Sequence, residues 1–340
     1  FDWKVPMEYN VKSARLLEID GKVILDFKKN NLHLLNCSIP FNKVVSFKEL
    51  KKHLYYRKEL PNAIPYRTSY YKKNWGFCLS YNHFKKLKKK KYKVEIKTNF
   101  KRGYMHYGEI LIKGNNNKEI FLSTNICHPS LANNELSGPT VLIHLAKYIN
   151  KLSKRRFSYR IIFIPETIGS IAYLSKNLKK MKKNFFAGFN CVCLGDQRDY
   201  SFLPSKNENS ISNFFAKKSL KYFKKKFRQY SWLSRGSDER QYCSPGVDLD
   251  VASLMKTKYH KYKEYHTSLD KLGTVVTQKG LQQGYNLLKK TINLIEQEHY
   301  PKSKIVCEPF MSKRDLYKAI GGRPRPVKII RYMNLISYAD

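Results

Sequence analysis

Apolar and polar positions follow two different patterns along this chain of 340 residues. From Glu119 onward, apolar runs of strand length are followed by longer stretches in which apolar residues recur every three or four positions, as in amphipathic helices. The predicted strands cover 119–126, 159–166, 185–196 and 247–255, and the predicted helices cover 138–152, 170–180, 209–223 and 277–297. This alternation favours an α/β fold with a mostly parallel mixed sheet sandwiched by helices.

Residues 20–112 have another pattern. Short stretches rich in aromatic and β-branched residues are separated by turn residues, which is typical of small all-β structures. We therefore expect residues 20–112 to form a β-rich subdomain inserted into the main α/β domain, whose N-terminal part is residues 1–19 and whose remainder is 113–320. Residues 321–340 read as a Gly/Pro-containing linker followed by the start of a helix.

Composition narrows the class of protein. The chain is 42% hydrophobic, enough to bury a sizeable core, and no apolar run approaches the roughly 18–20 residues of a membrane-spanning helix. Seven cysteines without a CxxC pair indicate reduced thiols in a cytoplasmic protein.

Lys and Arg number 66 against 26 Asp and Glu, which gives a formal net charge of +40. Such a charge favours binding of polyanions. However, Lys, Asn, Ile, Tyr and Phe are abundant together, as an AT-rich coding sequence would produce. The basic clusters at 85–93 and 176–184 also lie in no recognisable nucleic-acid module. We expect nonspecific anion binding, and a nucleic-acid function stays an alternative.

Polar clusters follow the predicted strands where each strand ends. His128 to Gly138 follows the first strand, Glu166 the second, Asp196 the third, and His266 follows the strand at 247–255 after a loop. Because the carboxyl ends of parallel strands meet at one edge of a sheet, these side chains could converge. Zinc accepts mixed histidine and carboxylate ligands with an open position for water, and an unligated glutamate can deprotonate that water.

Each cluster also has a structural alternative. A strand-end histidine can be a hydrogen-bonded structural residue, residues 135–138 can cap a helix, Glu166 can pair with a lysine, and Asp196 can cap a turn. A serine or cysteine hydrolase is not expected. The chain has no GxSxG motif, and Cys127 and His128, as neighbours on a strand, should point to opposite faces.

Several motifs resemble known ones. "NNELSG" (133–138), "GSDERQYCSPGVDL" (236–249) and "YHTSLDKLGTV" (265–275) are similar to segments of zinc aminopeptidases and carboxypeptidases, a clan that includes glutaminyl cyclases. The whole chain more closely resembles a bacterial aminopeptidase-like family of unassigned function, through "DWKVPMEYN", "IPYRTSYYKKNWGFCLS", "ICHPSLANNELSGP", "PETIGSIAYL" and "EYHTSLD". The resemblance implies a peptidase domain with a β-rich insertion and a C-terminal winged helix, which "YMNLISYAD" (332–340) would begin.

The resemblance also implies residue roles. His128 matches the first metal histidine of the clan, Asp196 its strand-end metal aspartate and His266 its late metal histidine. Glu166 matches the glutamate that acts as general base.

Two positions depart from the clan pattern. Its bridging aspartate falls on Asn134, and the second glutamate of its Glu-Glu pair falls on Thr167. A neutral amide carries no charge to offset the repulsion between two dications. We therefore expect one bound zinc ion rather than two, with Asn134 or the adjacent Glu135 facing it.

The resulting hypothesis is a metal-dependent hydrolase of aminopeptidase type that cleaves an N-terminal aminoacyl or related amide bond of a peptide or small aminoacyl substrate. At the rim, Asp238 or Glu239 would hold the substrate ammonium and Arg240 a carboxylate. Tyr265 would donate to the developing oxyanion.

The alternative function is a non-catalytic binding or regulatory protein with a degenerate metal site, which the lost bridging carboxylate motivates. The sequence leaves the oligomeric state open, and a homo-oligomer is one of the alternatives.

Overall fold

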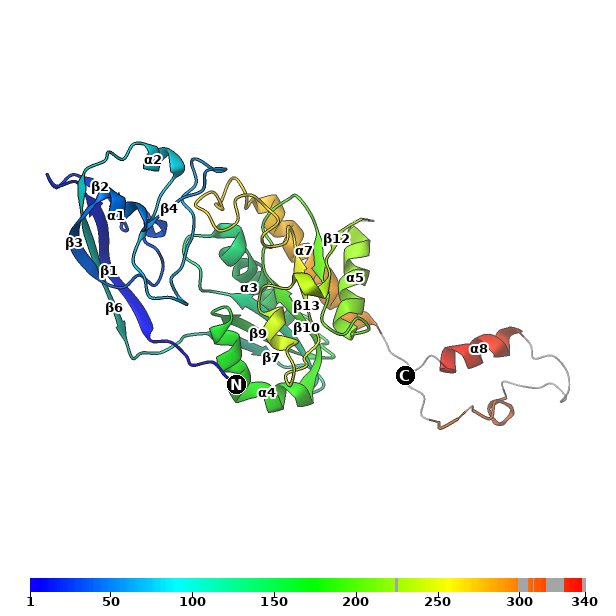
Figure 1. The fold of residues 1–340 in the computed structure, drawn as a ribbon. Coiled ribbons are helices and arrows are strands. Elements are labelled where there is room, and N and C mark those ends of the chain that lie inside the picture. Colours follow the sequence, from blue (N-terminus) through cyan, green and yellow to red (C-terminus); the bar gives the residue numbers. More distant parts are fainter. Residues whose placement is uncertain (224–225, 299–304, 308, 316–326, 338–340) are drawn as a thin grey trace. The chain divides into compact units, whose positions relative to one another are not determined.

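The computed structural model describes residues 1–223, 226–298, 305–307, 309–315 and 327–337. They belong to two units, Phe1–Asn293 and Leu294–Asp340. The first unit contains a large mixed sheet and a smaller antiparallel sheet (Figure 1).

The large sheet confirms the predicted fold class. Its strand order is β12-β11-β13-β10-β8-β9-β7, and the four central strands, β13, β10, β8 and β9, run parallel. On the edges, β7 is antiparallel to β9, and β11 is antiparallel to β13. The bounds are β7 (Gly108–Ile112), β8 (Glu119–Asn125), β9 (Ser158–Ile164), β10 (Phe185–Cys191), β11 (Ser201–Leu203), β12 (Arg228–Gln229) and β13 (Val251–Met255).

Helices cover both faces of this sheet. Alternate side chains of β8 point to opposite faces, so Phe121 packs with Tyr173 of α4 and Tyr242 of α6, while Thr124 lies against Gly138 of α3. The α3 face also carries α5 and α7, because α7 is hydrogen-bonded to both α3 and α5 (Figure 1). The helices are α3 (Ser137–Asn150), α4 (Ile168–Asn184), α5 (Ile211–Phe223), α6 (Glu239–Tyr242) and α7 (Gln278–Gln297), with a π-helix η2 (Ala132–Leu136) and a 3-10 turn η3 (Trp232–Ser234).

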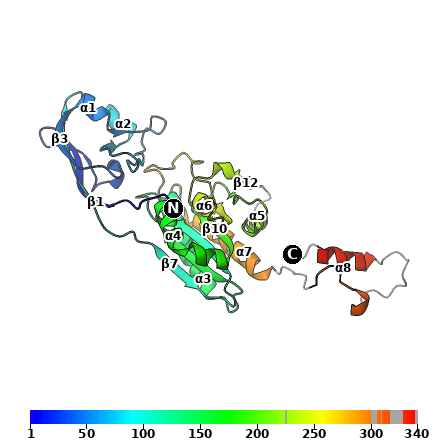
Figure 2. The same cartoon turned by 60° about the horizontal axis from the view of Figure 1, so that its bottom comes forward.

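The smaller sheet has the order β2-β1-β6-β3, and all its pairs are antiparallel. In β6, Tyr92, Val94 and Ile96 alternate with polar residues and face a core that includes Trp75 and Phe77. The elements of this region are β1 (Glu8–Leu17), β2 (Val23–Asp26), η1 (Asn31–His33), β3 (Phe41–Ser46), α1 (Phe47–Lys51), β4 (Leu54–Tyr55), β5 (Phe77–Cys78), α2 (Tyr81–Lys85) and β6 (Lys91–Lys101). Figure 2 shows this region beside the large sheet.

Two strands lie in a different sheet from the one the sequence suggested. β1 falls within residues 1–19, which we assigned to the peptidase-like part, yet it pairs with β6 and β2 in the smaller sheet. β7 falls within 20–112, the expected β-rich insertion, yet it pairs with β9 at the edge of the large sheet. Local alternation of side chains shows that a segment is a strand, but it does not reveal the partner.

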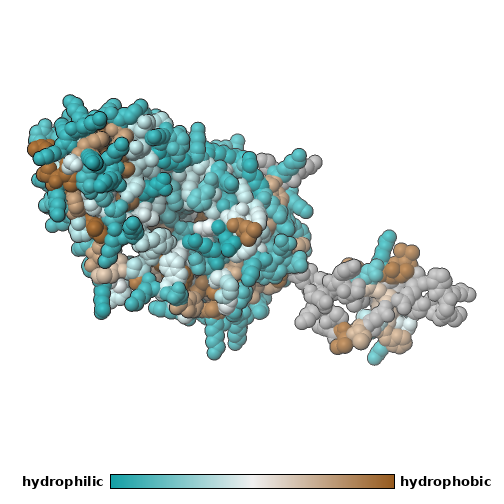
Figure 3. All heavy atoms as spheres, viewed as in Figure 1, coloured by the Kyte–Doolittle hydropathy of each residue, from teal (hydrophilic) through white to brown (hydrophobic). Residues whose placement is uncertain are grey.

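The second unit contains η4 (Ser312–Arg314) and α8 (Val327–Ser337). The predicted linker at 321–326 lies outside the described residues, and the winged helix stays a prediction. None of the helices in the described ranges combines the length and apolar character needed to cross a bilayer. Hydrophilic side chains dominate the face of the molecule shown in Figure 3.

Two glycines let α7 approach the segment after β10 very closely. A Cβ added to Gly280 would lie 1.9 Å from the carbonyl oxygen of Gly195, and one added to Gly284 would lie 2.3 Å from that of Leu194. Both obstacles are backbone atoms, which cannot rotate away. The close approach fixes the strand end that precedes Asp196.

We expect Gly284→Ala to lower the free energy of unfolding by about 1–3 kcal/mol, because the new methyl group must push the backbone of Leu194 away. Urea denaturation measures this change. Alanine would otherwise favour the helix, so the exposed Lys279→Ala on the same helix is the control and should leave stability nearly unchanged. A Gly284→Ala protein as stable as this control would contradict the close approach.

Candidate metal centre

The segment between β8 and α3 brings a histidine and a glutamate together. β8 ends at Asn125, and η2 then forms a wide helical turn whose residues include the buried Glu135. The Glu135 carboxylate is in direct contact with Nδ1 of His128. Single π-helical turns of this kind are frequent at functional sites.

Asp270, which is 137 residues from Asn133 along the chain, fixes the π-helix. Its carboxylate accepts the backbone N–H groups of Asn133 and Asn134 at 2.8 and 3.0 Å and the Tyr262 hydroxyl at 3.0 Å. Its own carbonyl accepts the N–H of Ala132 at 2.9 Å. Three of these hydrogen bonds, those from Ala132, Asn133 and Asn134, tie the loop after β13 to the loop after β8.

His266 lies in the same loop as Asp270 and faces His128. The two imidazole centroids are 5.1 Å apart, and the Tyr66 ring meets them edge-on at 5.0 and 5.2 Å. Tyr265 stacks on the other side of His266 at 3.9 Å. Nε2 of His266 is buried and has no hydrogen-bond partner among the described residues.

The backbone of His266 is held in the left-handed region, with φ of 54°. The Tyr66 N–H, which donates to its carbonyl at 2.8 Å, stabilises this conformation. Burial, reinforced by the nearby positive charges of His128, His260 and Arg67, lowers the pKa of His266 to about 2. The imidazole is therefore neutral at physiological pH, and a neutral imidazole is the form that binds metals.

Burial alone would lower the pKa of His128, but the contact with Glu135 and the charges of Glu135 and Glu166 outweigh it and raise that pKa. Nδ1 of His128 and the Glu135 carboxylate thus face each other at a place where a metal ion can bind.

Glu166 follows β9, and its carboxylate Oε2 lies 3.8 Å from Nε2 of His128. Burial raises the pKa of Glu166, although the His128 charge opposes this shift. The next residue, Thr167, has φ of 65°, which is strained for a β-branched side chain. Its N–H donates to Asp238 at 2.8 Å and its hydroxyl accepts from Arg240 at 2.6 Å, so two partners hold the strained turn beside Glu166.

Asp238 and Glu239 were expected at the rim, and the structure corrects this, because both are fully buried. Oδ1 of Asp238 accepts from Thr167 and from the Ser170 hydroxyl, while Oδ2 has no partner among the described residues. Burial and the adjacent Glu166 charge raise the pKa of Asp238 to about 8.

The Glu239 carboxylate is engaged by five donors, so it cannot also bind a substrate ammonium. They are the N–H groups of Gly236 and Ser237, the Tyr259 hydroxyl, the Asn190 amide and the Ser253 hydroxyl. Of the three residues expected at the rim, Asp238, Glu239 and Arg240, Arg240 is the half-buried one.

Asp196 lies at the end of the β10 strand segment, as predicted, but its carboxylate is also engaged. It accepts the Thr257 N–H and hydroxyl at 2.9 and 2.6 Å, the Arg198 N–H at 2.9 Å and the Asn133 amide at 3.3 Å. Through these hydrogen bonds Asp196 connects the loop after β10 to the loop after β13. Its role as a metal ligand stays a prediction.

The structure adds Cys127 to the site. In the described part of the chain, Cys127, His128 and Glu135 form a group whose ligand-type atoms all lie within 4.8 Å of one another. Sγ of Cys127 is 3.3 Å from Nδ1 of His128, so the expectation that these neighbours point apart was wrong. The strand ends at Asn125, and strand alternation does not apply beyond it.

A cysteine nucleophile is still disfavoured. Burial and the charges of Glu135 and Glu166 raise the pKa of Cys127 well above its ordinary value, which keeps it a thiol in the absence of metal. Asn134, the other ligand considered at this position, is buried, and its amide donates to Glu135 at 3.5 Å.

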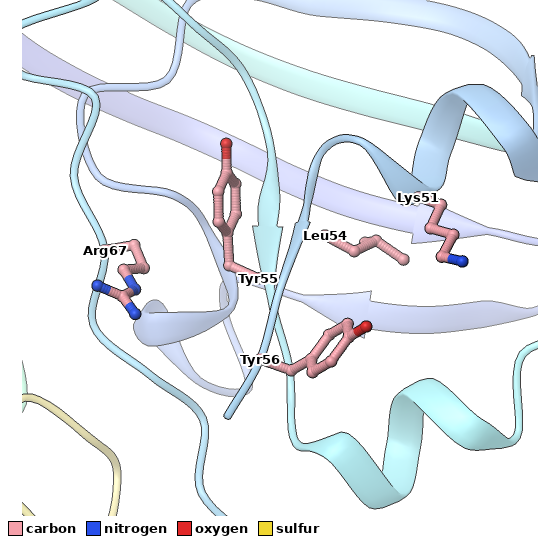
Figure 4. A pocket seen from close by; sticks show the side chains of 5 residues that line it. All are labelled: Lys51, Leu54, Tyr55, Tyr56 and Arg67. Carbon is pink, nitrogen blue, oxygen red and sulfur yellow. The ribbon is translucent and has the colours of Figure 1, made fainter. Parts of the chain in front are cut away.

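A separate hollow of about 350 Å³ lies in the β-rich region and is lined by Lys51, Leu54, Tyr55, Tyr56 and Arg67 (Figure 4). It contains none of the predicted site residues. Arg67 nevertheless follows Tyr66 directly, and its charge contributes to the low pKa of His266.

Comparison with known proteins identifies relatives. The profile of a family described as "Domain of unknown function (DUF4910)" matches residues 1–298. A protein of Clostridium acetobutylicum described as "Putative polysaccharide biosynthesis protein with aminopeptidase-like domain" is 39% identical over 323 residues, which cover 95% of this chain and 74% of that protein.

Solved structures show the same fold. The crystal structure of a "putative peptidase" from Clostridium acetobutylicum has a TM-score of 0.84 and 38% identity, and the match covers 95% of this chain and 78% of that one. BSAP, a zinc aminopeptidase from Bacillus subtilis, has a TM-score of 0.60 at 13% identity, with coverages of 87% and 86%. At that identity, the likeness to BSAP shows the fold alone.

We expect Asp270→Asn to lower the free energy of unfolding by about 1–3 kcal/mol, because an amide group cannot accept the hydrogen bonds that one of the two carboxylate oxygens accepts. Urea denaturation tests this, with the exposed Asp248→Asn as the matched control. Equal stability of the two variants would show that the contacts of Asp270 are dispensable.

The raised pKa of Asp238 predicts a pH effect in metal-free protein. An unfolded aspartate ionises near pH 3.9, whereas buried Asp238 keeps its proton to about pH 8. Its contribution to stability is therefore full below about pH 4 and is lost as the pH rises to about 8. Asp238→Asn, which cannot ionise, should gain stability relative to wild type across this window. Parallel stability curves for the two proteins, measured in chelator, would contradict the shift.

Proposed function

The chain belongs to the family described as domain of unknown function DUF4910 and is 39% identical to a protein described as having an aminopeptidase-like domain. We propose that it is a metal-dependent hydrolase of aminopeptidase type. Its proposed substrate is a peptide or small aminoacyl compound whose N-terminal amide bond is cleaved. The observation that supports this most strongly is the convergence of His128, His266 and Glu135 with Glu166 beside them.

The residues of the site fit a metal ion. Nε2 of His266 is a buried nitrogen without a partner among the described residues, and such an atom is costly unless it binds something. His128 and Glu135 supply a second imidazole and a carboxylate. Two imidazoles and a carboxylate are a donor set that catalytic zinc uses, so we propose zinc as the ion.

We propose one ion rather than two. The positions of the bridging aspartate and second glutamate are the neutral Asn134 and Thr167, and the Asn134 amide donates a hydrogen bond to Glu135. A second dication beside the first would find less negative charge to offset their repulsion.

A bound zinc ion would act as a Lewis acid toward the amide carbonyl and lower the pKa of water. Glu166 takes the proton of the attacking water and gives it to the leaving amine, and its raised pKa suits this exchange. Tyr265 stacks on His266 and holds the imidazole in place, and it is also the candidate donor to the oxyanion. Arg240, which reaches Thr167 beside Glu166, is the candidate for binding an anionic end of the substrate.

A non-catalytic binding protein is the second candidate. The specific observation in its favour is the neutral pair Asn134 and Thr167, at positions where the related clan has carboxylates. The two functions differ in whether the metal-loaded protein turns over an amide.

Hydrolysis of a panel of aminoacyl p-nitroanilides by zinc-loaded protein tests the proposal. Glu166→Gln should lower kcat by about 10²–10⁴-fold while zinc content stays at one ion per chain, because the side chain acts on the proton and not on the metal. Glu59→Gln, on an exposed side chain, is the control and should retain full activity.

Loss of zinc in His266→Ala, measured by elemental analysis, would support the assigned ligands. Full activity in Glu166→Gln would overturn the role of the base, and zinc-loaded wild type that hydrolyses no amide in the panel would favour the binding protein.

A further inference from the structure

Cys127 lies in the proposed metal site, yet the resemblance to zinc aminopeptidases gives it no role. We propose that Sγ of Cys127 is a further ligand of the metal, so that a thiolate joins the imidazole and carboxylate ligands proposed above; its ligand atom and those of His128 and Glu135 lie within 4.8 Å of one another. The inference rests on the metal ion of the proposed function, but not on catalysis.

The spacing of the donor atoms supports this. Sγ of Cys127 lies 3.3 Å from Nδ1 of His128 and 3.7 Å from Oε1 of Glu135. Ligands around a tetrahedral zinc ion, with Zn–S of about 2.3 Å and Zn–N and Zn–O of about 2.0–2.2 Å, stand about 3.3–3.6 Å from one another. Both distances from Sγ are therefore close to the distances between ligand atoms around a bound zinc ion. The His128–Glu135 contact then has to widen to admit the ion.

Coordination through Nδ1 also leaves the other nitrogen of His128 in a useful position. Nε2 lies 3.8 Å from Oε2 of Glu166, so the imidazole can bind the cation on one side and face the base on the other. Metal-bound histidines commonly make such a contact to a carboxylate through their second nitrogen.

Charge balance favours a thiolate at this position. With Asn134 neutral, Glu135 is the one carboxylate in the group, and a dication held by it and by neutral imidazoles keeps a net charge of +1 beside the buried Glu135. A thiolate brings the total to zero. As the sulfur–metal bond forms, the S–H bond breaks and its proton leaves for solvent.

The surroundings of the sulfur suit a metal-bound thiolate. The backbone N–H of Glu166 donates to Sγ at 3.2 Å, and hydrogen bonds of this kind stabilise the negative charge of a ligand sulfur. The same hydrogen bond links the ligand to the residue that carries the base. A sulfur ligand also shifts metal preference toward zinc, cobalt and cadmium and away from magnesium.

Cobalt(II) in place of zinc tests the assignment, because a cobalt–thiolate bond gives a charge-transfer absorption in the near ultraviolet that nitrogen and oxygen ligands do not give. The full chain is freed of metal and titrated with cobalt(II), and bound metal is measured by elemental analysis. Cys307, also exposed and unpaired, offers the matched control Cys307→Ser.

We expect wild type and Cys307→Ser to show the band at one cobalt per chain. Cys127→Ser should lose the band and bind cobalt at least tenfold more weakly. Zinc should also protect one thiol of the native protein from a disulfide reagent in wild type and in Cys307→Ser, and none in Cys127→Ser.

Two results would overturn the inference, and they are distinguishable. Stoichiometric cobalt without the band, or with a band that survives in Cys127→Ser, would remove Cys127 from the ligand set and leave the proposed metallohydrolase intact. Absence of bound cobalt and zinc from folded wild type would remove the metal site itself, and the proposed function with it.

Discussion

The carboxylate of Asp270 carries the constraint on which the site depends. It accepts two successive backbone N–H groups of η2 and thereby holds a π-helical turn in place, while its own chain segment bears His266. Buried N–H groups left without an acceptor would be costly, so the turn and the loop are stable chiefly as a pair. His128, Glu135 and His266 come together because of this connection.

Strained backbone near the site is also held by distant segments. Thr167 and His266 both have positive φ; Thr167 donates to Asp238 and accepts from Arg240, and the carbonyl of His266 accepts from Tyr66. Tyr66 lies between β4 and β5, in the β-rich region and ahead of β6 of the smaller antiparallel sheet. The β-rich region therefore contributes directly to the ordering of the site, through the Tyr66 ring and its N–H group.

The fold of this chain is more widely shared than the residues of its candidate site. The large sheet and its helices match the fold of a zinc aminopeptidase at 13% identity, whereas the resemblance of motifs implies neutral Asn134 and Thr167 in place of two carboxylates. A fold can persist while its site changes, because the sheet is stabilised by apolar packing that does not depend on the charge of a few loop residues. The electrostatics of the loops then decide how many cations such a site can hold, and Glu135 and Glu166 are the carboxylates nearest His128 here.

The sequence by itself determined the central strands β8, β9, β10 and β13 and their helices, because periodicity of apolar residues is a local property. Its motifs also singled out His128, Glu166 and His266, which the structure brings together. Only the tertiary structure decided that β1 pairs in the smaller sheet and β7 in the large one. The burial of Glu239 among five donors and the contact of Cys127 with His128 were also decided there. These features depend on hydrogen-bond partners far away in sequence and on where a strand ends, and neither is encoded in the pattern of neighbouring residues.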